Sequence, residues 1–347
     1  MILLLAVALF QEKPEELITA AVKQLLKCQE AEGTWSYEGV YRVKGEIPVG
    51  YRVGGTSVVA GALMAAAPED KDVAVAVEKG LSAVLKDLAD PLMATSTVDA
   101  YDVRVWGHLC ALEFLCRLRA AKKLPKEGAE WIPKLVASLV EEQLKDGGWN
   151  YASRRAHAPF VTAPVVQSLL LAKSQGEDIA PELFVKAKKA LEGSRQESGV
   201  FRYSGTGPSK EELPGSIARS GASETTLILL GGGSVDAARK AVAAFHEHWG
   251  ELEKRRKKTG THVPPYQIAP YYVYYGHRYA AQAIEVLPEK ERAGEREKLL
   301  KVILKTRDED GTWNDRVFAR SKAYGTAEIV LALLGAKSPG FPALEKK

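Results

Sequence analysis

Four segments of the chain carry a glycine followed two residues later by an aromatic residue, and they constrain the fold more than any other feature. Two of them read Gln29-Glu-Ala-Glu-Gly33-Thr-Trp35 and Gln143-Leu-Lys-Asp-Gly147-Gly-Trp149. The other two, Arg195 to Phe201 and Arg307 to Trp313, have arginine in place of the first glutamine. We interpret each segment as the end of a helix, a turn that needs glycine, and an aromatic that folds back onto the next helix. Such recurrence indicates a chain built from repeated structural units.

Two kinds of helical pattern alternate around these segments. Amphipathic stretches cover roughly residues 14 to 29, 72 to 89, 131 to 144, 181 to 195, 236 to 249 and 294 to 306. Largely apolar stretches cover roughly 56 to 67, 101 to 119, 161 to 173, 219 to 231, 270 to 287 and 322 to 334. A helix that is apolar all round is buried, whereas a helix with one polar face lies outside. The sequence therefore predicts an all-α fold, an (α/α)6 toroid of six inner and six outer helices, in a single domain over residues 14–347.

The first thirteen residues differ from the rest. Residues 1 to 10 are all apolar and make up about half the length of a membrane span. We interpret residues 1–13 as an export signal that lacks a basic start, and an apolar N-terminal segment packed on the core is the alternative. Export predicts a periplasmic or secreted protein, and the alternative predicts a cytoplasmic one. No transmembrane span is predicted.

Charge and cysteine content exclude several classes of protein. Lys and Arg number 48 against 44 Asp and Glu, so no nucleic-acid partner is predicted. Cys28, Cys110 and Cys116 provide neither a disulfide framework nor the ligand spacing of a structural zinc site. The apolar content of 46% is enough for a large core, so stability is expected to come from packing. No cofactor is predicted, and the oligomeric state is left open.

The repeated segments and the alternating helices resemble the α/α toroids of the squalene-hopene cyclases and the protein prenyltransferase β subunits, known for their QW repeats. The resemblance covers the chain after residue 14 and is most specific at Gln29 to Trp35 and Gln143 to Trp149. It implies inner helices that surround a central cavity. The QW repeats of that family are structural, so they bear on the fold and not on the activity.

The catalytic motifs of that family are matched only in part. Its cyclases carry a DxDD acid motif, and the nearest match is Asp99-Ala-Tyr-Asp102. Asp99 and Asp102 are therefore candidate catalytic acids, with capping of the following helix as the alternative role. Its prenyltransferases hold zinc with Asp, Cys and His, but Arg104 stands where that cysteine would lie. His108 and Cys110 point about 200° apart on a helix, so no metal site is predicted.

The predicted inner helix over residues 270–287 provides a candidate ligand-binding face. Tyr271, Tyr275, Arg278 and Tyr279 recur at helical spacing on one side of it. Aromatic rings in such a row bind a cation or an isoprenoid chain, or stack against sugars. Packing between helices is the alternative role for these residues.

Glu224 and two arginines complete the set of candidates. Glu224 stands in an otherwise uncharged stretch, so it either faces the cavity as a third candidate acid or pairs with a base such as Arg219 or Arg278. Arg104 and Arg219 belong to a group of arginines near the starts of the inner helices, where an anion would be favoured. Pairing with nearby carboxylates is the alternative for these arginines.

Three classes of function follow from these residues, and whether the protein is an enzyme is left open. The first is a terpenoid cyclase-like or prenyltransferase-like protein that acts on or binds an isoprenoid in a central cavity. The second is a non-catalytic binding or scaffold toroid, because the family's acid and zinc motifs are incomplete. The third is a glycan-acting (α/α)6 enzyme that uses the tyrosines and arginines to bind sugars.

Overall fold

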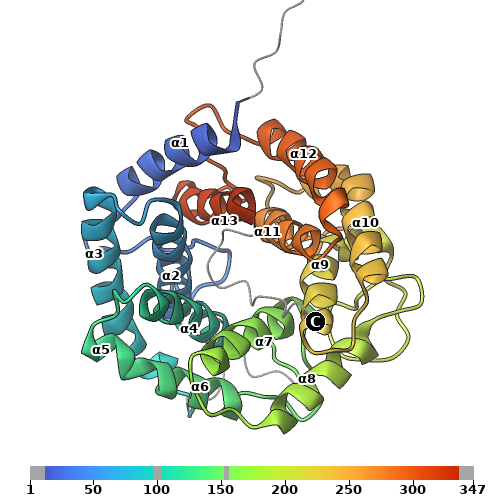
Figure 1. The fold of residues 1–347 in the computed structure, drawn as a ribbon, viewed down its shortest axis with the longest axis horizontal. Coiled ribbons are helices and arrows are strands. Elements are labelled where there is room, and N and C mark those ends of the chain that lie inside the picture. The colour runs from blue at the N-terminus through green and yellow to red at the C-terminus, as the bar shows by residue number, and fades with distance from the viewer. Residues whose placement is uncertain (1–11, 97–102, 152–155, 336–347) are drawn as a thin grey trace, which may run out of the picture.

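The chain forms a closed double ring of helices. The computed structural model describes residues 12–96, 103–151 and 156–335, and within them the only extended pairings are three isolated β-bridges. The inner ring consists of α2 (Val49–Ala66), α4 (Arg104–Ala120), α7 (Pro159–Ser174), α9 (Leu213–Leu229), α11 (Tyr272–Glu285) and α13 (Lys322–Leu334). The outer ring consists of α1 (Pro14–Lys27), α3 (Lys71–Leu88), α6 (Trp131–Glu141), α8 (Pro181–Ser194), α10 (Val235–Glu253) and α12 (Glu289–Lys305). Figure 1 shows the two rings, so the predicted (α/α)6 toroid is confirmed.

Three short helices lie in the connections: α5 (Lys126–Ala129), η1 (Pro91–Met93) and η2 (Ala319–Ser321). Within the described parts of the chain, no helix is both long enough and apolar enough to cross a membrane. Residues 1–11, which carry most of the predicted export signal, lie outside the described residues.

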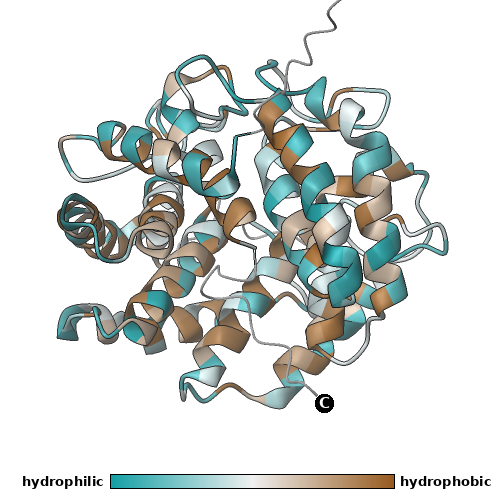
Figure 2. Ribbon diagram, turned by 45° about the horizontal axis from the view of Figure 1, so that its top comes forward, coloured by the Kyte–Doolittle hydropathy of each residue, from teal (hydrophilic) through white to brown (hydrophobic). Residues whose placement is uncertain are grey.

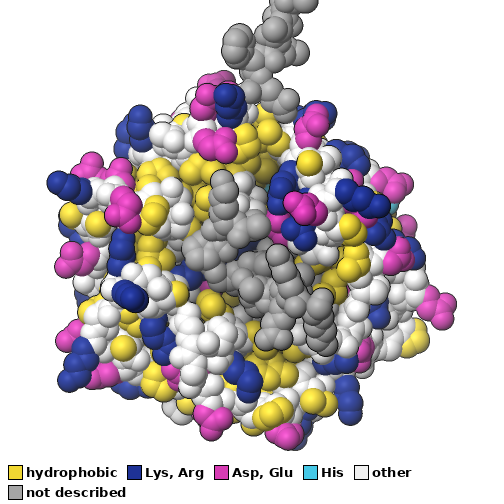
Figure 3. Space-filling view, viewed as in Figure 1, with side chains coloured by type: hydrophobic (Ala, Val, Ile, Leu, Met, Phe, Trp, Pro, Cys, Tyr) yellow, Lys and Arg dark blue, Asp and Glu magenta, His cyan; other side chains and the backbone are white. Residues whose placement is uncertain are grey.

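The polarity of each helix matches its ring. The outer helix α1 buries Leu17, Ala21, Val22 and Leu25 on one face, as expected for an amphipathic helix. The inner helix α7 is buried along most of its length. Figure 2 shows mixed hydrophilic and hydrophobic faces on the outer helices. On the face shown in Figure 3, charged side chains gather along the outer rim, and hydrophobic ones lie nearer the centre.

The tryptophans of the repeated segments occupy equivalent positions between the rings. Each indole Nε1 donates to a carbonyl near the end of the preceding outer helix: Trp35 to Leu25 at 2.8 Å, Trp149 to Leu139 at 2.7 Å and Trp313 to Ile303 at 2.9 Å. Each backbone N–H donates to a threonine hydroxyl of the following inner helix: Thr56 at 3.0 Å, Thr162 at 2.9 Å and Thr326 at 3.0 Å. Phe201 donates in the same way to Ser216 at 2.8 Å. These segments therefore fasten an outer helix to the next inner one.

The glutamines of the two full repeats extend this connection to a third helix. The Gln29 side-chain amide donates to the carbonyl of Gly33 at 3.0 Å and to that of Ala76, on α3, at 2.8 Å. The Gln143 amide donates to Gly147 at 2.8 Å and to Leu183, on α8, at 3.0 Å. One side chain thus closes the turn and holds the neighbouring outer helix, which explains why the repeat begins with an amide.

The helix α2 begins at Val49, several residues before the predicted apolar stretch. Its first turns carry Gly54 and Gly55, which are poor helix formers by propensity. A Cβ on Gly54 would lie 2.2 Å from the Trp106 ring, and one on Gly55 would lie 2.5 Å from the Trp35 carbonyl oxygen. Tertiary contacts therefore override the local preference, because only glycine leaves room for this close approach.

Candidate functional site

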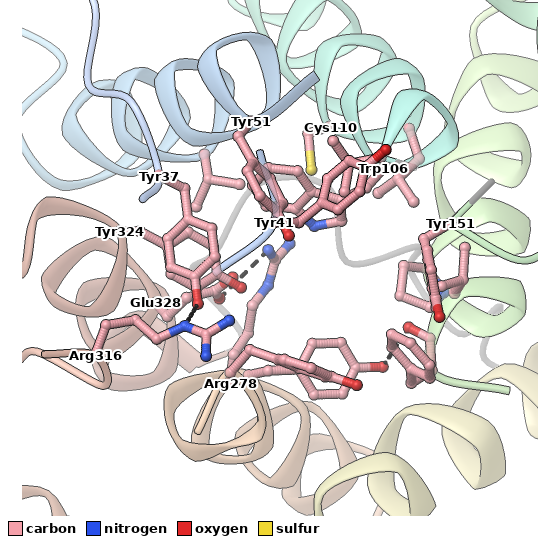
Figure 4. A pocket seen from close by; sticks show the side chains of 18 of the residues that line it. Tyr37, Tyr41, Tyr51, Trp106, Cys110, Tyr151, Arg278, Arg316, Tyr324 and Glu328 are labelled. Atoms are coloured by element: carbon pink, nitrogen blue, oxygen red, sulfur yellow. Dashed lines mark hydrogen bonds and ion pairs between the residues drawn. The ribbon is translucent and has the colours of Figure 1, made fainter. Parts of the chain in front are cut away.

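A cavity of about 630 Å³ opens between the inner helices, in the centre of the toroid. Helices α2, α4, α7, α11 and α13 and the loops beside them supply its wall. The aromatic residues of that wall are Tyr37, Tyr41, Tyr51, Trp106, Tyr151, Phe160, Tyr203, Tyr271, Tyr275, Tyr279 and Tyr324. Figure 4 shows the labelled rings of Tyr37, Tyr41, Tyr51, Trp106, Tyr151 and Tyr324 around the open space. The volume is within the usual range of small-molecule sites.

The aromatic rings are held by contact with one another. On one side of the cavity the Tyr37 and Tyr324 ring centroids lie 4.6 Å apart, and Trp106 lies 5.8 Å from Tyr324. On the other side Phe160 stacks on Tyr203 at 5.7 Å and on Tyr271 at 5.8 Å. Edge-to-face and stacked contacts of this kind fix ring orientation, so the wall presents preformed aromatic surfaces.

A buried charge cluster forms part of the wall around Arg278. Arg278 Nη2 donates to Glu113 Oε1 at 2.6 Å, and Nη1 lies 3.5 Å from Glu328 Oε2. Arg117 also pairs with Glu113. Burial opposes ionisation of Glu113, but Arg117 and Arg278 outweigh it and hold its pKa below the ordinary value. Burial raises the pKa of Glu328, and Arg278 offsets that only in part. Among the described residues of the cavity wall, Glu328 is therefore a carboxyl group that holds a proton more readily than usual.

A second polar group lies beside Tyr37. Arg316 Nε donates to the Tyr37 hydroxyl oxygen at 2.8 Å, and that hydroxyl donates to Asp315 Oδ2 at 3.0 Å. The Asp315 side chain is fully buried, and burial raises the pKa of its carboxyl to about 6, although Arg316 and the Tyr37 hydrogen bond act against it. Figure 4 shows Arg316 next to Tyr37 at the edge of the cavity.

The far side of the cavity carries a tyrosine and histidine cluster. His262 Nδ1 lies 3.1 Å from the Gln267 carbonyl oxygen and must donate to it, so Nε2 accepts from the Tyr271 hydroxyl at 3.3 Å. Burial lowers the pKa of His262, which favours this neutral form. The hydroxyls of Tyr151 and Tyr203 lie 3.3 Å apart. This side therefore offers neutral hydrogen-bonding groups.

The four predicted residues of the 270–287 stretch meet at the cavity. Tyr271, Tyr275, Arg278 and Tyr279 all line it. The Tyr275 hydroxyl donates to the Phe160 carbonyl at 2.9 Å, and the Arg278 guanidinium carbon lies 5.3 Å from the Tyr279 ring centroid. Their common helical face explains the shared placement, and partners from other helices fix each side chain.

The remaining predicted residues that the structure describes lie outside the cavity wall. Asp99 and Asp102 fall outside the described residues, although the next residue, Val103, lines the cavity. Arg104 is buried and its Nε donates to Glu142 Oε1 at 2.9 Å, so its partner is a carboxylate of the protein. No residue of α9 is among the described residues of the cavity wall. This placement separates Arg219 and Glu224 from the cavity.

Both of these α9 residues form ion pairs, as the alternative role of each predicted, but the partner of Glu224 is not one of the two arginines expected. Arg219 pairs with Glu211 and its Nε donates to the Phe201 carbonyl at 2.8 Å. Glu224 pairs with Arg195 at 3.0 Å and not with Arg219 or Arg278. Burial still raises the pKa of Glu224. Both side chains secure the loop between α8 and α9, because Arg195, Phe201 and Glu211 all belong to that loop.

Several cavity residues that were not predicted from the sequence occupy equivalent positions in the repeats. The position two residues after each repeat aromatic is Tyr37, Tyr151, Tyr203 and Asp315. The three tyrosines line the cavity, and Asp315 lies behind Tyr37. Each repeat aromatic fastens the loop, so the residue two positions later enters the interior at an equivalent point. Within the described ranges, no group of three or more His, Cys, Asp or Glu side chains is arranged to hold a metal ion.

No known family model matches the sequence, and no curated protein matches it. Solved structures do match in fold. The type II terpene cyclase MstE from Scytonema, in complex with geranylgeranyl dihydroxybenzoate, has a TM-score of 0.59 at 15% identity, covering 94% of this chain and 97% of the cyclase. An inactive variant of the α-1,6-mannanase GH76A of Salegentibacter sp. HEL1_6, in complex with α-1,6-mannotriose, has a TM-score of 0.62 at 12% identity, covering 93% and 99%. The Lin0763 protein of Listeria innocua has a TM-score of 0.58 at 13% identity, covering 92% and 97%.

These similarities show the toroid fold and nothing finer. The cyclase and the mannanase act on unlike substrates within the same architecture, so the fold alone assigns no chemistry. The expected resemblance is confirmed at the level of the α/α toroid. Function must be inferred from the cavity.

Proposed function

We propose that the protein binds an isoprenoid chain in its central cavity and acts on it as a terpenoid cyclase-like enzyme. One observation carries the proposal: eleven aromatic side chains surround a cavity whose wall includes Glu328, a carboxyl group with a raised pKa. The faces of aromatic rings attract cations, and a largely apolar cavity suits a hydrocarbon chain. The fold similarity to a type II terpene cyclase supports the proposal without deciding it.

The chemistry that fits this wall begins with proton transfer. A carboxylic acid donates its proton to one carbon of a C=C bond, the π electron pair forms the new C–H bond, and the other carbon becomes a carbocation. A second C=C bond of the chain attacks that cation and forms a ring. Loss of a proton from a neighbouring carbon to the carboxylate restores the acid, so the product is an isomer of the substrate.

The residues divide these tasks between them. Glu328 holds the proton, and Arg278 at 3.5 Å stabilises the carboxylate that remains after transfer. The Tyr275 and Tyr279 rings, 4.4 Å apart, lie on the same helix as Arg278 and present faces that stabilise a positive charge. Asp99 and Asp102, just before the cavity residue Val103, are the second candidates for the acid.

The other functions are less well supported. A sugar chain needs many polar partners, yet the described carboxylates of the charge cluster, Glu113 and Glu328, are engaged by arginines. A scaffold toroid does not require an acid in its cavity, so it leaves the raised pKa of Glu328 without a role. Prenyl transfer would require a second substrate in addition to the isoprenoid.

The test uses geranylgeraniol as probe in D2O. An acid-initiated cyclase should release an isomer with fewer double bonds and one deuterium on carbon, detected by mass spectrometry. Glu328→Gln keeps the shape and removes the acid, so turnover should fall at least about 100-fold if Glu328 is the donor. Glu285→Gln is the matched control, because Glu285 is equally buried on an inner helix but pairs with Arg296 outside the cavity. This control should keep full turnover.

The remaining outcomes separate the alternatives. Loss of turnover with Asp102→Asn and not with Glu328→Gln would move the acid to the segment before α4, and loss with Glu224→Gln would move it to α9. Binding of geranylgeraniol without conversion by any route would favour the scaffold. Binding of α-1,6-mannotriose in its place would favour the glycan-acting alternative.

We also propose, from residues 1–10 alone, that the protein is exported. Expression of the full chain with a C-terminal tag, followed by cell fractionation, should recover it outside the cytoplasm and shortened at its N-terminus. Recovery of the intact chain from the cytoplasm would contradict export.

A further inference from the structure

Arg316 is a buried cation for which the described part of the chain supplies no ion pair. Its exposed fraction is only 3%. Its Nε donates to the Tyr37 hydroxyl at 2.8 Å, and neither Nη atom has a hydrogen-bond partner among the described residues. Asp315 is linked to it only through that hydroxyl. Buried arginines are normally paired with an anion. The Nη N–H groups of Arg316 are therefore donors without a partner among the described residues.

Two aromatic rings hold the Arg316 guanidinium at the cavity wall. The guanidinium carbon lies 5.6 Å from the Tyr37 ring centroid and 5.6 Å from the Tyr271 ring centroid. Two aromatic contacts and one hydrogen bond thus hold the planar group, and Arg316 is part of the cavity wall. A guanidinium held in this way is suited to bind a planar anion with two parallel hydrogen bonds.

We propose that Arg316 binds a carboxylate at one end of the ligand, so that the substrate class is an isoprenoid chain that ends in a carboxylic acid. This inference rests on the proposed function, whose substrate it narrows. The carboxylate pairs with the Nη atoms of Arg316, and the hydrocarbon chain extends along the aromatic wall toward Arg278 and Glu328.

The charges around the cavity favour a carboxylate over a diphosphate. Arg278, the other arginine of the described wall, is already engaged by Glu113 and Glu328. Arg316 reaches Asp315 only through the Tyr37 hydroxyl, so its Nη atoms keep donors for one carboxylate. A diphosphate would bring about three negative charges into a cavity that already contains a carboxyl group, and unpaired buried charge is strongly unfavourable.

The wild-type protein provides the first test. Dissociation constants are measured by equilibrium dialysis at pH 8 for geranylgeranoic acid, its methyl ester and geranylgeranyl diphosphate, below their micellar concentrations. The acid and the ester share one hydrocarbon chain and differ in charge. We expect the acid to bind about 10 to 100 times more tightly than the ester, as charge-assisted hydrogen bonds imply, and more tightly than the diphosphate.

Variants assign the preference to Arg316. Arg316→Gln should bring the acid to the affinity of the ester and leave ester binding unchanged, whereas Arg316→Lys should keep part of the preference. Arg320→Gln is the matched control, since Arg320 lies four residues away and pairs with Glu30 and Glu38. This control should keep the full preference. If Arg316→Gln does not fold, the preference for the acid over the ester is still tested by the wild-type protein and by Arg316→Lys.

Failure of this inference differs from failure of the proposed function. Equal binding of acid and ester, or a preference that survives Arg316→Gln, would overturn the carboxylate subsite and leave isoprenoid binding intact. Tighter binding of the diphosphate would overturn the substrate class. Absence of binding by acid, ester and geranylgeraniol alike would overturn the proposed function itself.

Discussion

The ionisable side chains around the cavity are held in unequal states by burial and by their partners. The pKa of Glu113 is lowered because two arginines outweigh its burial, whereas the pKa of Glu328 is raised because burial outweighs the single arginine beside it. The two carboxyl groups share Arg278. Neighbouring carboxyl groups whose pKa values differ in this way are common where proton transfer occurs. At the scale of single residues, Glu328 is therefore the better suited of the two to donate a proton.

The buried Asp315 predicts a pH-dependent contribution to stability. Its pKa is about 6 in the folded protein and about 3.9 in an unfolded chain. The folded state therefore holds the proton more tightly, and this stabilisation is fully present below about pH 4 and lost as the pH rises through about 6. The change should be on the order of 2–3 kcal/mol.

Substitution of Asp315 by Asn isolates that contribution. We expect the free energy of unfolding of the wild type, relative to that of Asp315→Asn, to decrease as the pH rises from about 4 to about 6. Urea unfolding at several pH values measures both proteins. A difference that stays constant over this window would show that Asp315 titrates normally.

At the scale of elements, the repeated segments connect each outer helix to the next inner helix through hydrogen bonds and packing. Trp149 is fully buried and hydrogen bonded both to α6, through Leu139, and to α7, through Thr162. Its side chain therefore contributes packing and the hydrogen bond to Leu139, while its backbone N–H makes the bond to Thr162. Because the same arrangement recurs at Trp35 and Trp313, the junction is a property of the repeat.

Trp149→Ala should destabilise the protein by about 3–5 kcal/mol, the usual cost of removing a large buried aromatic. Trp131→Ala is the comparison, because Trp131 is only partly buried at the start of α6. Its cost should be clearly smaller. Chemical denaturation of both variants measures the difference, and equal losses would show that Trp149 has no special place in the fold.

The repeat glycines predict a second contrast. Gly147 has φ +96° and a Cβ there would lie 2.5 Å from the Lys186 carbonyl oxygen, whereas Gly199 has φ +83° and open space around it. Gly199→Ala should therefore cost only the left-handed backbone strain, about 1–2 kcal/mol. Gly147→Ala should cost more, because α8 must also move. Free energies of unfolding for the two variants test this order.

At the scale of the whole molecule, the ring closes where the last hairpin meets the first. Helix α13 packs against α1, α2 and α11. Ser321 Oγ donates to the Glu38 carbonyl at 2.6 Å and accepts from the Glu38 N–H at 3.2 Å. Tyr37 and Asp315 join the same two regions. Closure thus completes the cavity wall with residues far apart in sequence.

Ser321→Ala should weaken this closure by about 1–3 kcal/mol, since it leaves the Glu38 backbone groups without their partner. Ser82→Ala serves as control, because Ser82 is exposed on α3 and contacts only its own helix. The control should change stability by no more than about 0.5 kcal/mol. Thermal or urea unfolding measures both, and a neutral Ser321→Ala would place the closure energy elsewhere.

The sequence by itself determined the toroid and one face of the cavity. Repeated segments such as Gln143 to Trp149 and the alternation of apolar and amphipathic stretches are local patterns, and each dictates which side of a helix is buried. The spacing of Tyr271, Tyr275, Arg278 and Tyr279 fixed their common face in the same way.

Only the tertiary structure decided which residues of other helices and loops pack against that face and which partners the charged side chains have. The run around Glu224 is otherwise uncharged, so charge patterning assigns the carboxylate to no face, and packing against α8 turned it toward Arg195 and away from the cavity. Likewise Arg316 meets Tyr37 only because the ring closes across 279 residues. Helical periodicity is encoded over a few neighbouring residues, whereas rotation and closure depend on contacts between distant ones.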